Sequence, residues 1–346
     1  MTGARGLGDR RQPLRLSSAQ LVATRLPDAA EYPLLVEPRL AGLDLVEWAA
    51  DHRVWIDEQL VRHGALLFRG FHLPDAAAFA RFVHASSHAP MPYTERSSPR
   101  QLIADNIYTS TSHPAEHEIC LHNEQSYNLT FPARICFYCI TPAAERGATP
   151  IASTRRVLAA LPPALVEPFA AGGYRYVRNF GSGVGLSWQT AFQTGDRAEV
   201  ERYAAANQIE LEWLGRDRLR TRQVRRCLAR HPHTGELLWF NHLTFFHPST
   251  LPPGVLAELR GALADDELGN HTCHGDGSPI EPAVMDTLRA AYLGAKVTVP
   301  WQRHDCLLLD NLAMAHGRES YRGERSIATA MSEPRSWSDV APRGEP

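Results

Sequence analysis

The sequence predicts a mainly β protein with helical insertions, in which the strands form a double-stranded β-helix, the jelly-roll type of barrel. Two observations support this fold class. Short apolar runs bounded by turn residues occur in the first half and again near the C-terminus, and segments with helical spacing of apolar residues lie between them. The same pattern would also suit a parallel α/β fold, so the order of elements does not decide between the two.

The first half is expected to alternate helices with buried strands. Apolar residues recur at helical spacing over Leu43–His63, and the run GALLFRGF that follows indicates a buried strand between glycines. Asp75–Ala85 predicts a second helix. Ala133–Ile140, rich in β-branched and aromatic residues, predicts a buried strand. The segment TPIASTRRVLAAL passes from strand to helix, with Ser153 or Thr154 as the N-cap.

The second half begins with Ala191–Gln223, where acidic, basic and apolar residues at helical spacing predict helices with turns. ELLWFNHLTFFH is typical of a strand, and Gly254–Ala264 behind a Pro-Pro entry is typical of a helix. Three short strands are expected near the C-terminus, over Ala295–Val299, Asp305–Leu309 and Ser326–Met331.

One jelly-roll domain over residues 19–335 is the predicted organisation, with a helical insertion around 190–230, a disordered lead-in over 1–18 and a tail over 336–346. A length of 346 residues exceeds the usual single-domain size but suits a large β domain with insertions. Hydrophobic residues make up 44% of the chain and charged residues 21%, as in soluble globular proteins. The lead-in carries four arginines and no apolar segment, which argues against a secretory signal.

Charge and cysteine usage narrow the classes of partner. A formal net charge of −2 gives no global positive field, so neither nucleic acid nor a membrane surface is an expected partner. No apolar run is long enough to span a bilayer. Six cysteines spread through a long chain do not indicate a disulfide framework, and we expect reduced thiols in a cytoplasm. A small-molecule or protein-tethered substrate is therefore expected.

The residues that could carry chemistry are concentrated in two segments, of which the first is CLHNEQSY. Alternate side chains of an extended segment point the same way, so His122 and Glu124 can present an imidazole and a carboxylate to one point. Such a pair would supply two ligands of one metal ion. A His-x-Glu pair is also common by chance, and its ordinary interpretation is a surface strand.

In the second segment, DCLLLDNLAMAHGRESYRGERSIATAM, an apolar strand leads through a turn to His316, and Arg325 opens the next strand. Two imidazoles and one carboxylate on one face of a metal leave positions open for a bidentate ligand and dioxygen, as in non-haem iron(II) oxygenases. The forked guanidinium of Arg325 could then pair with the distal carboxylate of 2-oxoglutarate. Taken alone, His316 would be a loop or capping residue, and Arg325 would form a surface ion pair with Glu324 or Glu319.

Several motifs in order along the chain resemble one family: HNEQSY, PAAERGATPIAS, GLSWQTAFQT, LRTRQ, HPHTGELLWFN and LLLDNLAMAHGRESYRGER. Together they are similar to the taurine dioxygenase (TauD/TfdA) family of clavaminate-synthase-like oxygenases. The likeness extends from about Gly64 to Met331. It is nearest to the branch that hydroxylates amino acids for nonribosomal peptides, of which the syringomycin-pathway aspartate hydroxylase is an example. The resemblance implies iron(II), 2-oxoglutarate and dioxygen as cofactor and cosubstrates, with ascorbate as a candidate supporting reductant.

Carried over residue by residue, the resemblance gives each matched position a role. It implies three iron ligands, a hydrogen bond to 2-oxoglutarate and a partner for the distal carboxylate of that cosubstrate. These residues are, in that order, His122, Glu124 and His316, then Thr149, then Arg325.

Two departures from the family pattern bear on the reaction. Members that act on sulfonates have a second arginine shortly after the cosubstrate arginine, whereas this chain has Thr329 there, so a taurine-like substrate is not expected. The related halogenases replace the carboxylate ligand by a small residue that makes room for chloride. Because Glu124 fills this position, the resemblance implies hydroxylation and not halogenation.

The implied substrate is an amino acid, either free or tethered to a peptidyl carrier protein, in the synthesis of a secondary metabolite such as an antibiotic. Decarboxylation of 2-oxoglutarate would accompany hydroxylation of an unactivated carbon. Desaturation or epoxidation of another small metabolite would use the same residues and differ in where the pocket holds the substrate. The candidate substrate-binding residues, each of which could equally pack in the core, are Gln125, Ser126, Tyr127, Trp188, Phe240 and Asn241.

Two readings from other classes stay open. A non-catalytic barrel that binds a ligand or a carrier protein would not require three metal ligands together with Arg325 and Thr149. A zinc hydrolase would act without oxygen, but in HPAEHEIC the next histidine is one residue too far for the HExxH motif. CFYC is expected to be core packing and HTCHGD an exposed loop, since neither has a partner cluster at zinc spacing.

Overall fold

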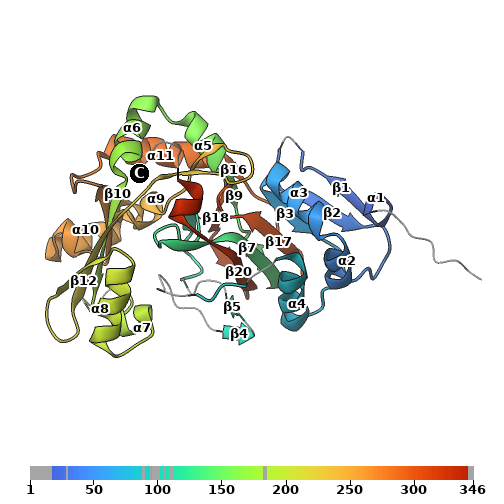
Figure 1. Ribbon diagram of the computed structural model, residues 1–346, viewed down its shortest axis with the longest axis horizontal. Coiled ribbons are helices and arrows are strands. Elements are labelled where there is room, and N and C mark those ends of the chain that lie inside the picture. The colour runs from blue at the N-terminus through green and yellow to red at the C-terminus, as the bar shows by residue number, and fades with distance from the viewer. Residues whose placement is uncertain are drawn as a thin grey trace, which may run out of the picture.

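The computed structural model describes residues 18–341 except 29, 88–89, 94, 96–101, 105, 110–112 and 182–184. Apart from Ser18, the predicted lead-in lies outside these residues. The described chain consists mostly of strands with helices packed around them (Figure 1). Its largest sheet has eight strands, in the spatial order β1 (Val22–Arg25), β2 (Leu34–Pro38), β3 (Ala65–Phe68), β17 (Cys306–Asp310), β7 (Thr130–Thr141), β20 (Ser326–Ser336), β5 (Ile107–Thr109) and β4 (Leu102–Ala104).

A smaller sheet of four strands faces the eight-stranded one. Its order is β16 (Lys296–Val297), β9 (Ile151–Ser153), β18 (Met314–Arg318) and β6 (Ile119–His122). Side chains alternate across a strand, so Ile135 and Phe137 of β7 point into a core shared with Ile151 of β9 and Met314 of β18. Strands buried on both faces are apolar throughout, which accounts for the runs ALLF, ICFYCI and CLLL.

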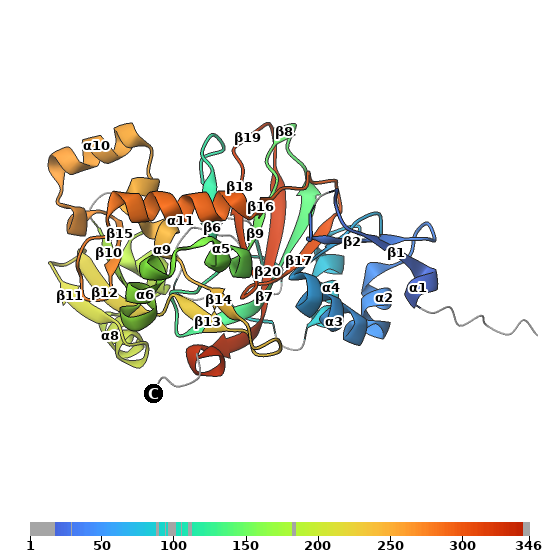
Figure 2. The same cartoon turned by 90° about the horizontal axis from the view of Figure 1, so that it is seen from above.

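Helices cover the outer faces of both sheets. The even-numbered side chains Cys136 and Tyr138 of β7 pack against α2 (Leu45–Asp51), α3 (Arg53–His63) and α4 (Ala76–Ser86), which lie together at one end of the molecule (Figure 1). The smaller sheet is covered by α5 (Thr154–Ala160), α6 (Pro163–Gly172), α9 (Leu243–Phe246) and the long α11 (Pro282–Gly294), as the view from above shows (Figure 2).

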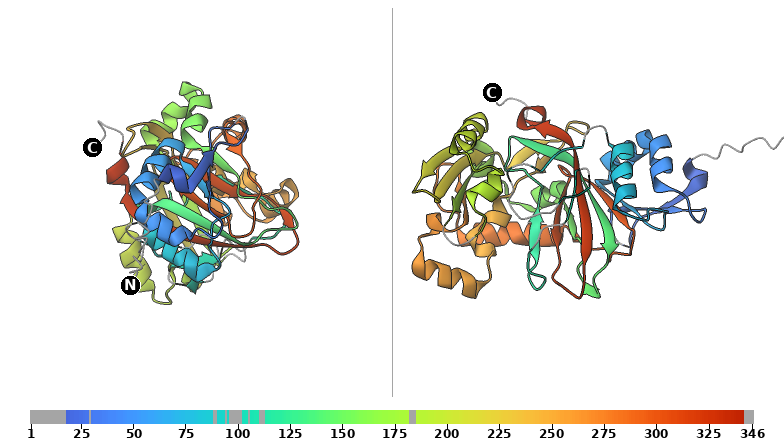
Figure 3. Two further views of the ribbon diagram at one scale, coloured as in Figure 1. Left: turned by 90° about the vertical axis from the view of Figure 1, so that its right-hand side faces the viewer. Right: turned by 90° about the horizontal axis from the view of Figure 1, so that it is seen from below.

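A third sheet lies at the end of the molecule opposite to the N-terminal helices (Figure 3). Its strands are, in spatial order, β11 (Glu210–Trp213), β12 (Leu219–Arg225), β10 (Tyr174–Phe180) and β15 (Asn270–His274), and α7 (Trp188–Phe192) and α8 (Arg197–Ala206) pack on it. The remaining elements are α1 (Ser18–Leu21), α10 (Pro253–Ala262), the short pairs β8 (Glu145–Arg146) with β19 (Tyr321–Arg322) and β13 (Leu228–Arg230) with β14 (Leu237–Trp239), and the 3-10 turns η1 (Pro248–Thr250), η2 (Asp265–Glu267) and η3 (Trp337–Val340).

Local signals placed several helix starts correctly. Ser153 caps α5 by accepting a hydrogen bond from the backbone N–H of Arg156, and Asp75 caps α4 in the same way. The helix predicted over Leu43–His63 is divided at His52 into α2 and α3. CFYC lies in β7 with both cysteines buried, so the expectation of core packing is confirmed.

Other expectations were wrong where a period-2 pattern resembled a helical one. The insertion predicted around 190–230 is helical only as far as Ala206, and β11 and β12 then form an antiparallel pair. Alternate side chains of β12 are buried. ELLWFNHLTFFH is a strand only up to Trp239, and the short helix α9 begins at Leu243, whose N–H donates to the Asn241 side chain. HTCHGD was expected to be an exposed loop, but its first four residues belong to β15.

The end of the chain is packed further than the predicted tail implied. Residues 337–340 form η3, and Trp337 packs against Phe131 and Phe240 in a small apolar cluster. Among the described residues, no strand pair joins an edge of the eight-stranded sheet to the four-stranded one, so strand pairing does not close a barrel. None of the described helices is both long enough and apolar enough to cross a membrane.

Candidate metal centre

Two adjacent strands bring the two histidines of the predicted triad together. β6 and β18 pair antiparallel with His122 directly opposite His316, and the centroids of the two rings are 4.5 Å apart. The strand register shifts between His316 and Arg318. Gly317 is needed at this irregularity, because a Cβ there would lie 2.5 Å from the backbone oxygen of Ile119. The close approach of the strands thus depends on a glycine beside the ligand.

Glu124 joins the two histidines from a turn, since β6 ends at His122 and the chain bends directly after it. One ligand atom from each of the three residues lies within 4.8 Å of the others, and all three side chains are buried. Glu124 Oε2 is 3.8 Å from His316 Nε2. His122 and Glu124 were expected to lie in one extended segment. Instead, the strand ends at His122, and the turn that follows brings Glu124 to the same point.

The donor set fits a metal such as iron(II). Nδ1 of His122 lies 2.8 Å from the backbone oxygen of Cys120, and since only an N–H can donate to a carbonyl, the lone pair of this imidazole is on Nε2. Phe245 packs on the His122 ring and Phe137 on the His316 ring, which limits access of water. Two imidazoles and one carboxylate are the ligands of the facial arrangement expected from the sequence.

A small cavity of about 40 Å³ adjoins the triad and contains the predicted cosubstrate residues. Thr149 and Arg325 line it together with His122 and His316. Nε of Arg325 donates to the backbone oxygen of Gly147 at 2.7 Å, and its Nη2 lies 3.5 Å from Thr149 Oγ1. No described carboxylate pairs with Arg325, so the surface ion pair considered as an alternative does not form.

A second arginine lines the same cavity. Arg318 is buried, and its Nη atoms donate to three backbone oxygens, those of His113, Pro114 and His117. Burial, and next the neighbouring Arg318 guanidinium, lower the pKa of Arg325 to about 10, so Arg325 remains a cation at neutral pH. Of the two cations beside the triad, Arg318 is buried and Arg325 is partly buried, and neither has a described carboxylate partner. This makes the cavity electrostatically suited to an anion.

The six predicted substrate-binding residues do not line this cavity. Gln125, Ser126 and Tyr127 are fully buried behind the ligands, and the Tyr127 hydroxyl donates to the backbone oxygen of Glu95. Trp188 packs on Trp213 in the cluster beneath the third sheet.

Phe240 and Asn241 also lie in the interior. Phe240 belongs to the apolar cluster around Phe131 and Trp337, and the Asn241 amide bonds to the backbone at Cys227 and Leu243. The structure therefore assigns Trp188 and Phe240 to packing, which was the alternative considered from the sequence.

Sequence reasoning missed three residues that the structure places at or beside the site. Arg318 follows His316 at the spacing that returns a side chain to the same strand face, which is a signal that could have indicated it. Trp301 donates from Nε1 to Thr149 Oγ1 at 3.2 Å, and Asn311 bonds to the backbone of Glu124. These two contacts join segments far apart in the chain, so no local pattern could have shown them.

Comparison with known proteins decides the family. Residues 28–331 match the taurine catabolism dioxygenase TauD, TfdA family. The chain belongs to this family. A TauD, TfdA family member is an enzyme, and this protein is accordingly a non-haem oxygenase that depends on iron and 2-oxoglutarate and consumes dioxygen.

Individual relatives cover most of the chain. The dapdiamide synthesis protein DdaC of Enterobacter agglomerans is 38% identical over 309 residues, which are 89% of this chain and 93% of the relative. The tyrosine isonitrile desaturase of Erwinia amylovora is 25% identical over 306 residues, 85% of this chain and 84% of that protein. The solved structure of PvcB from Pseudomonas aeruginosa, an iron- and alpha-ketoglutarate-dependent oxygenase, superposes with a TM-score of 0.52 at 19% identity, covering 92% of this chain and 94% of PvcB. At that identity the likeness shows the fold.

Proposed function

We propose that this TauD, TfdA family oxygenase hydroxylates an amino acid, free or tethered to a peptidyl carrier protein, at an iron site formed by His122, Glu124 and His316. The convergence of these three side chains beside a cationic cavity carries the proposal, because a metal and a dicarboxylate cosubstrate need adjacent binding sites. A binding module would need neither the triad nor the two arginines that line the cavity. We also propose that the two facing sheets are the halves of a double-stranded β-helix.

The residues around the cavity have different roles in binding the metal and the cosubstrate. When bound, iron supplies the chemistry that uses 2-oxoglutarate and dioxygen to oxidise an unactivated carbon. The three side chains would hold the metal, and the Phe137 and Phe245 rings shield the two imidazoles from water. Arg325 would pair with the distal carboxylate of 2-oxoglutarate by a charge-assisted hydrogen bond, and the Thr149 hydroxyl would form a hydrogen bond to the same cosubstrate. Arg318 adds a second positive charge behind them.

The type of substrate is supported by two positions and two relatives. Thr329 lines the cavity where family members that act on sulfonates carry an arginine, and its buried hydroxyl has no hydrogen-bond partner in the described chain. A neutral group there disfavours a sulfonate. Glu124 keeps the metal position that a halide would need. DdaC takes part in dapdiamide synthesis by its name, which supports a biosynthetic role. The isonitrile desaturase makes desaturation the second candidate outcome.

The metal assignment is tested by substitution of a ligand. We expect His122→Ala to abolish succinate formation from 2-oxoglutarate, because the loss of one of three ligands leaves an incomplete site. His271→Ala is the matched control, since His271 lies on β15 in the third sheet and away from the cavity. If His122→Ala with native folding still couples 2-oxoglutarate decarboxylation to substrate oxidation, the assignment is wrong.

The substrate is tested by succinate release and product mass across free amino acids and their carrier-bound forms. Hydroxylation adds one oxygen atom, about 16 mass units, whereas desaturation removes two hydrogens, so mass spectrometry separates the two candidate outcomes. We expect carrier-bound amino acids to stimulate succinate release more than free ones. Equal rates would remove the tethered substrate and leave the free amino acid.

A further inference from the structure

Asn311 lies in the turn between β17 and β18, and its side chain reaches across to the backbone of Glu124. Its Oδ1 accepts from the N–H of Glu124 at 2.8 Å, and its Nδ2 donates to the backbone oxygens of Glu124 at 2.9 Å and Pro132 at 2.8 Å. Asn311 is fully buried. Because both amide hydrogens and the amide oxygen are used, the orientation of this side chain is fixed.

The contact substitutes for a missing strand partner. Glu124 lies in the turn beyond the end of β6, where no sheet ladder serves its backbone. A buried backbone N–H and C=O both need partners, and here one side chain provides them as a neighbouring strand would. The contact therefore fixes the Glu124 α-carbon relative to the turn that leads into His316, which lies five residues after Asn311.

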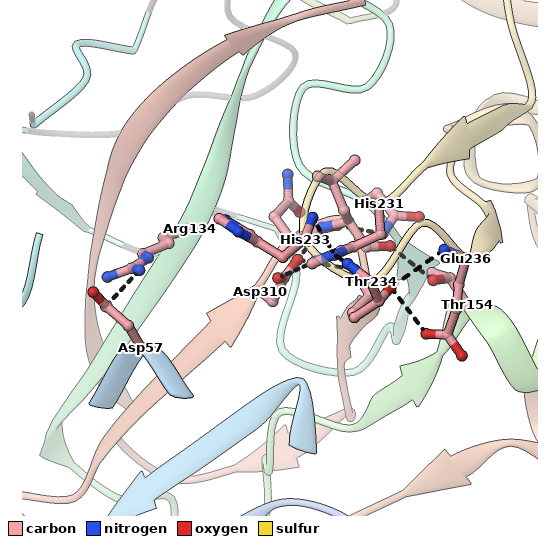
Figure 4. A network of polar contacts seen from close by, with 12 residues as sticks. Asp57, Arg134, Thr154, His231, His233, Thr234, Glu236 and Asp310 are labelled. Carbon is pink, nitrogen blue, oxygen red and sulfur yellow. Dashed lines mark hydrogen bonds and ion pairs between the residues drawn. The ribbon is translucent and has the colours of Figure 1, made fainter. Parts of the chain in front are cut away.

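The turn itself is held from two further directions. Asn123 Nδ2 donates back to the oxygens of Asn311 at 2.7 Å and Met314 at 3.3 Å. Asp310 Oδ1 accepts hydrogen bonds from the backbone N–H groups of Leu312 at 2.9 Å and Ala313 at 3.0 Å. Its Oδ2 accepts from His231 Nε2 at 2.8 Å, as Figure 4 shows. His231 can donate there because its Nδ1 accepts backbone N–H groups.

We propose that Asn311 is a positioning residue of the metal site, which holds Glu124 at the distance from His316 that a shared metal ion requires. It acts through Glu124 and need not touch metal or substrate. Groups of this kind, one shell outside the ligands, typically change metal affinity by about 10–100-fold when removed. The inference deepens the proposed function, because it rests on Glu124 being a ligand.

The test is titration of the metal-free protein with Co(II) alone, followed by its visible absorption, with thermal unfolding measured beside it. We expect Asn311→Ala to weaken Co(II) binding by about 10–100-fold. Asn311→Asp should weaken it at least as much, because a carboxylate oxygen would then face two carbonyl oxygens. If saturating iron(II) restores turnover in Asn311→Ala, the residue acts on the position of the ligand and not on the chemical step.

Asn179→Ala is the matched control. Asn179 is also buried, and its Nδ2 likewise donates to two backbone oxygens, those of Asp266 and Leu268, but in the third sheet. We expect a similar loss of thermal stability in Asn179→Ala with unchanged Co(II) affinity. Should Asn311→Ala fail to fold, Asn123→Ala removes the reciprocal contact and is expected to weaken Co(II) binding by a smaller factor.

The outcomes separate this proposal from the function on which it rests. Wild-type Co(II) affinity in Asn311→Ala, or in its substitute Asn123→Ala, would overturn the positioning role while Glu124→Ala still abolishes binding. Unchanged affinity in Glu124→Ala would instead overturn the triad itself. A loss that Asn179→Ala matches would show a general effect of stability and would also overturn the proposal.

Discussion

Two hollows of this molecule contain charged side chains, and they differ in what those charges meet. The larger is a groove of about 1320 Å³ between α3 and the β13–β14 turn, where Asp57 pairs with Arg134 at 2.7 Å and His231 with Asp310 at 2.8 Å (Figure 4). The smaller is the cavity of about 40 Å³ beside the triad, in which Arg318 and Arg325 meet no described carboxylate. Size therefore does not mark the functional site.

Whether a charged side chain can bind a ligand thus depends on whether it already has a partner of opposite charge. In the groove, opposite charges neutralise one another and hold the walls together. In the cavity, a buried and a partly buried cation lie beside the candidate metal ligands, and neither cation is paired with a described carboxylate. This arrangement carries a cost in stability that a bound anion would offset. Two neighbouring residues illustrate this difference between the groove and the cavity. Asp310 lines the groove, whereas Asn311 binds the backbone of Glu124 at the candidate metal site.

Loss of Arg325, the proposed partner of the cosubstrate, should have the largest effect. We expect Arg325→Met to raise the KM for 2-oxoglutarate by about 100-fold or more, because a buried charge-assisted contact is typically worth 2–5 kcal/mol. Steady-state kinetics with varied 2-oxoglutarate measures it. Arg134→Met in the groove is the control and should leave this KM unchanged. Equal effects of the two substitutions would contradict the proposed difference between the groove and the cavity.

Arg318→Met should have an intermediate effect. The second cation contributes to the field in the cavity without being the proposed partner of the carboxylate, so we expect about a 10-fold rise in the KM for 2-oxoglutarate. Added salt should reduce the difference from wild type only slightly, since buried charges are poorly screened. A fall in kcat with an unchanged KM would mean that Arg318 supports only the loop at 113–117.

Glu95 tests whether an ion pair with an arginine can offset the cost of burying a carboxylate completely. Burial raises the pKa of this carboxyl above its ordinary value of 4.5, despite Arg178 at 3.5 Å and a hydrogen bond from Tyr203. A raised pKa means that the folded protein holds the proton more tightly than the unfolded chain, so the stability from Glu95 is complete below pH 4.5 and is lost as pH rises through the folded pKa. Denaturant unfolding at several pH values should therefore favour Glu95→Gln over wild type increasingly from pH 4 to 8. A constant difference would contradict the shift.

The smallest effect is expected in the groove. The Asp57 carboxylate is 36% exposed, so its ion pair with Arg134 is screened by water. We expect Asp57→Asn to change the free energy of unfolding by about 1 kcal/mol or less. It should not alter Co(II) affinity or the KM for 2-oxoglutarate. A larger change in either would show that the groove communicates with the metal site.

Features that short stretches of sequence encode could be predicted without the structure. Apolar runs located β3, β7 and β17, and polar residues such as Ser153 and Asp75 located helix starts. The order of motifs predicted the triad together with Thr149 and Arg325, and these five side chains lie close together in the structure. The same information failed over 210–225, because a half-buried strand with alternating arginines offers the charged and apolar mixture of a helix.

Contacts between side chains far apart in the sequence could be found only in the folded protein. Phe240 and Trp188 were candidate pocket residues until their aromatic neighbours assigned them to packing. The seat of Glu124 depends on Asn311, 187 positions away, and the cavity depends on Arg318 turning into it. A local pattern reports the period and burial of one segment, whereas a hydrogen bond between distant segments exists only once the sheets have paired in register. That pairing of His122 with His316 converts a common spacing into a candidate metal site.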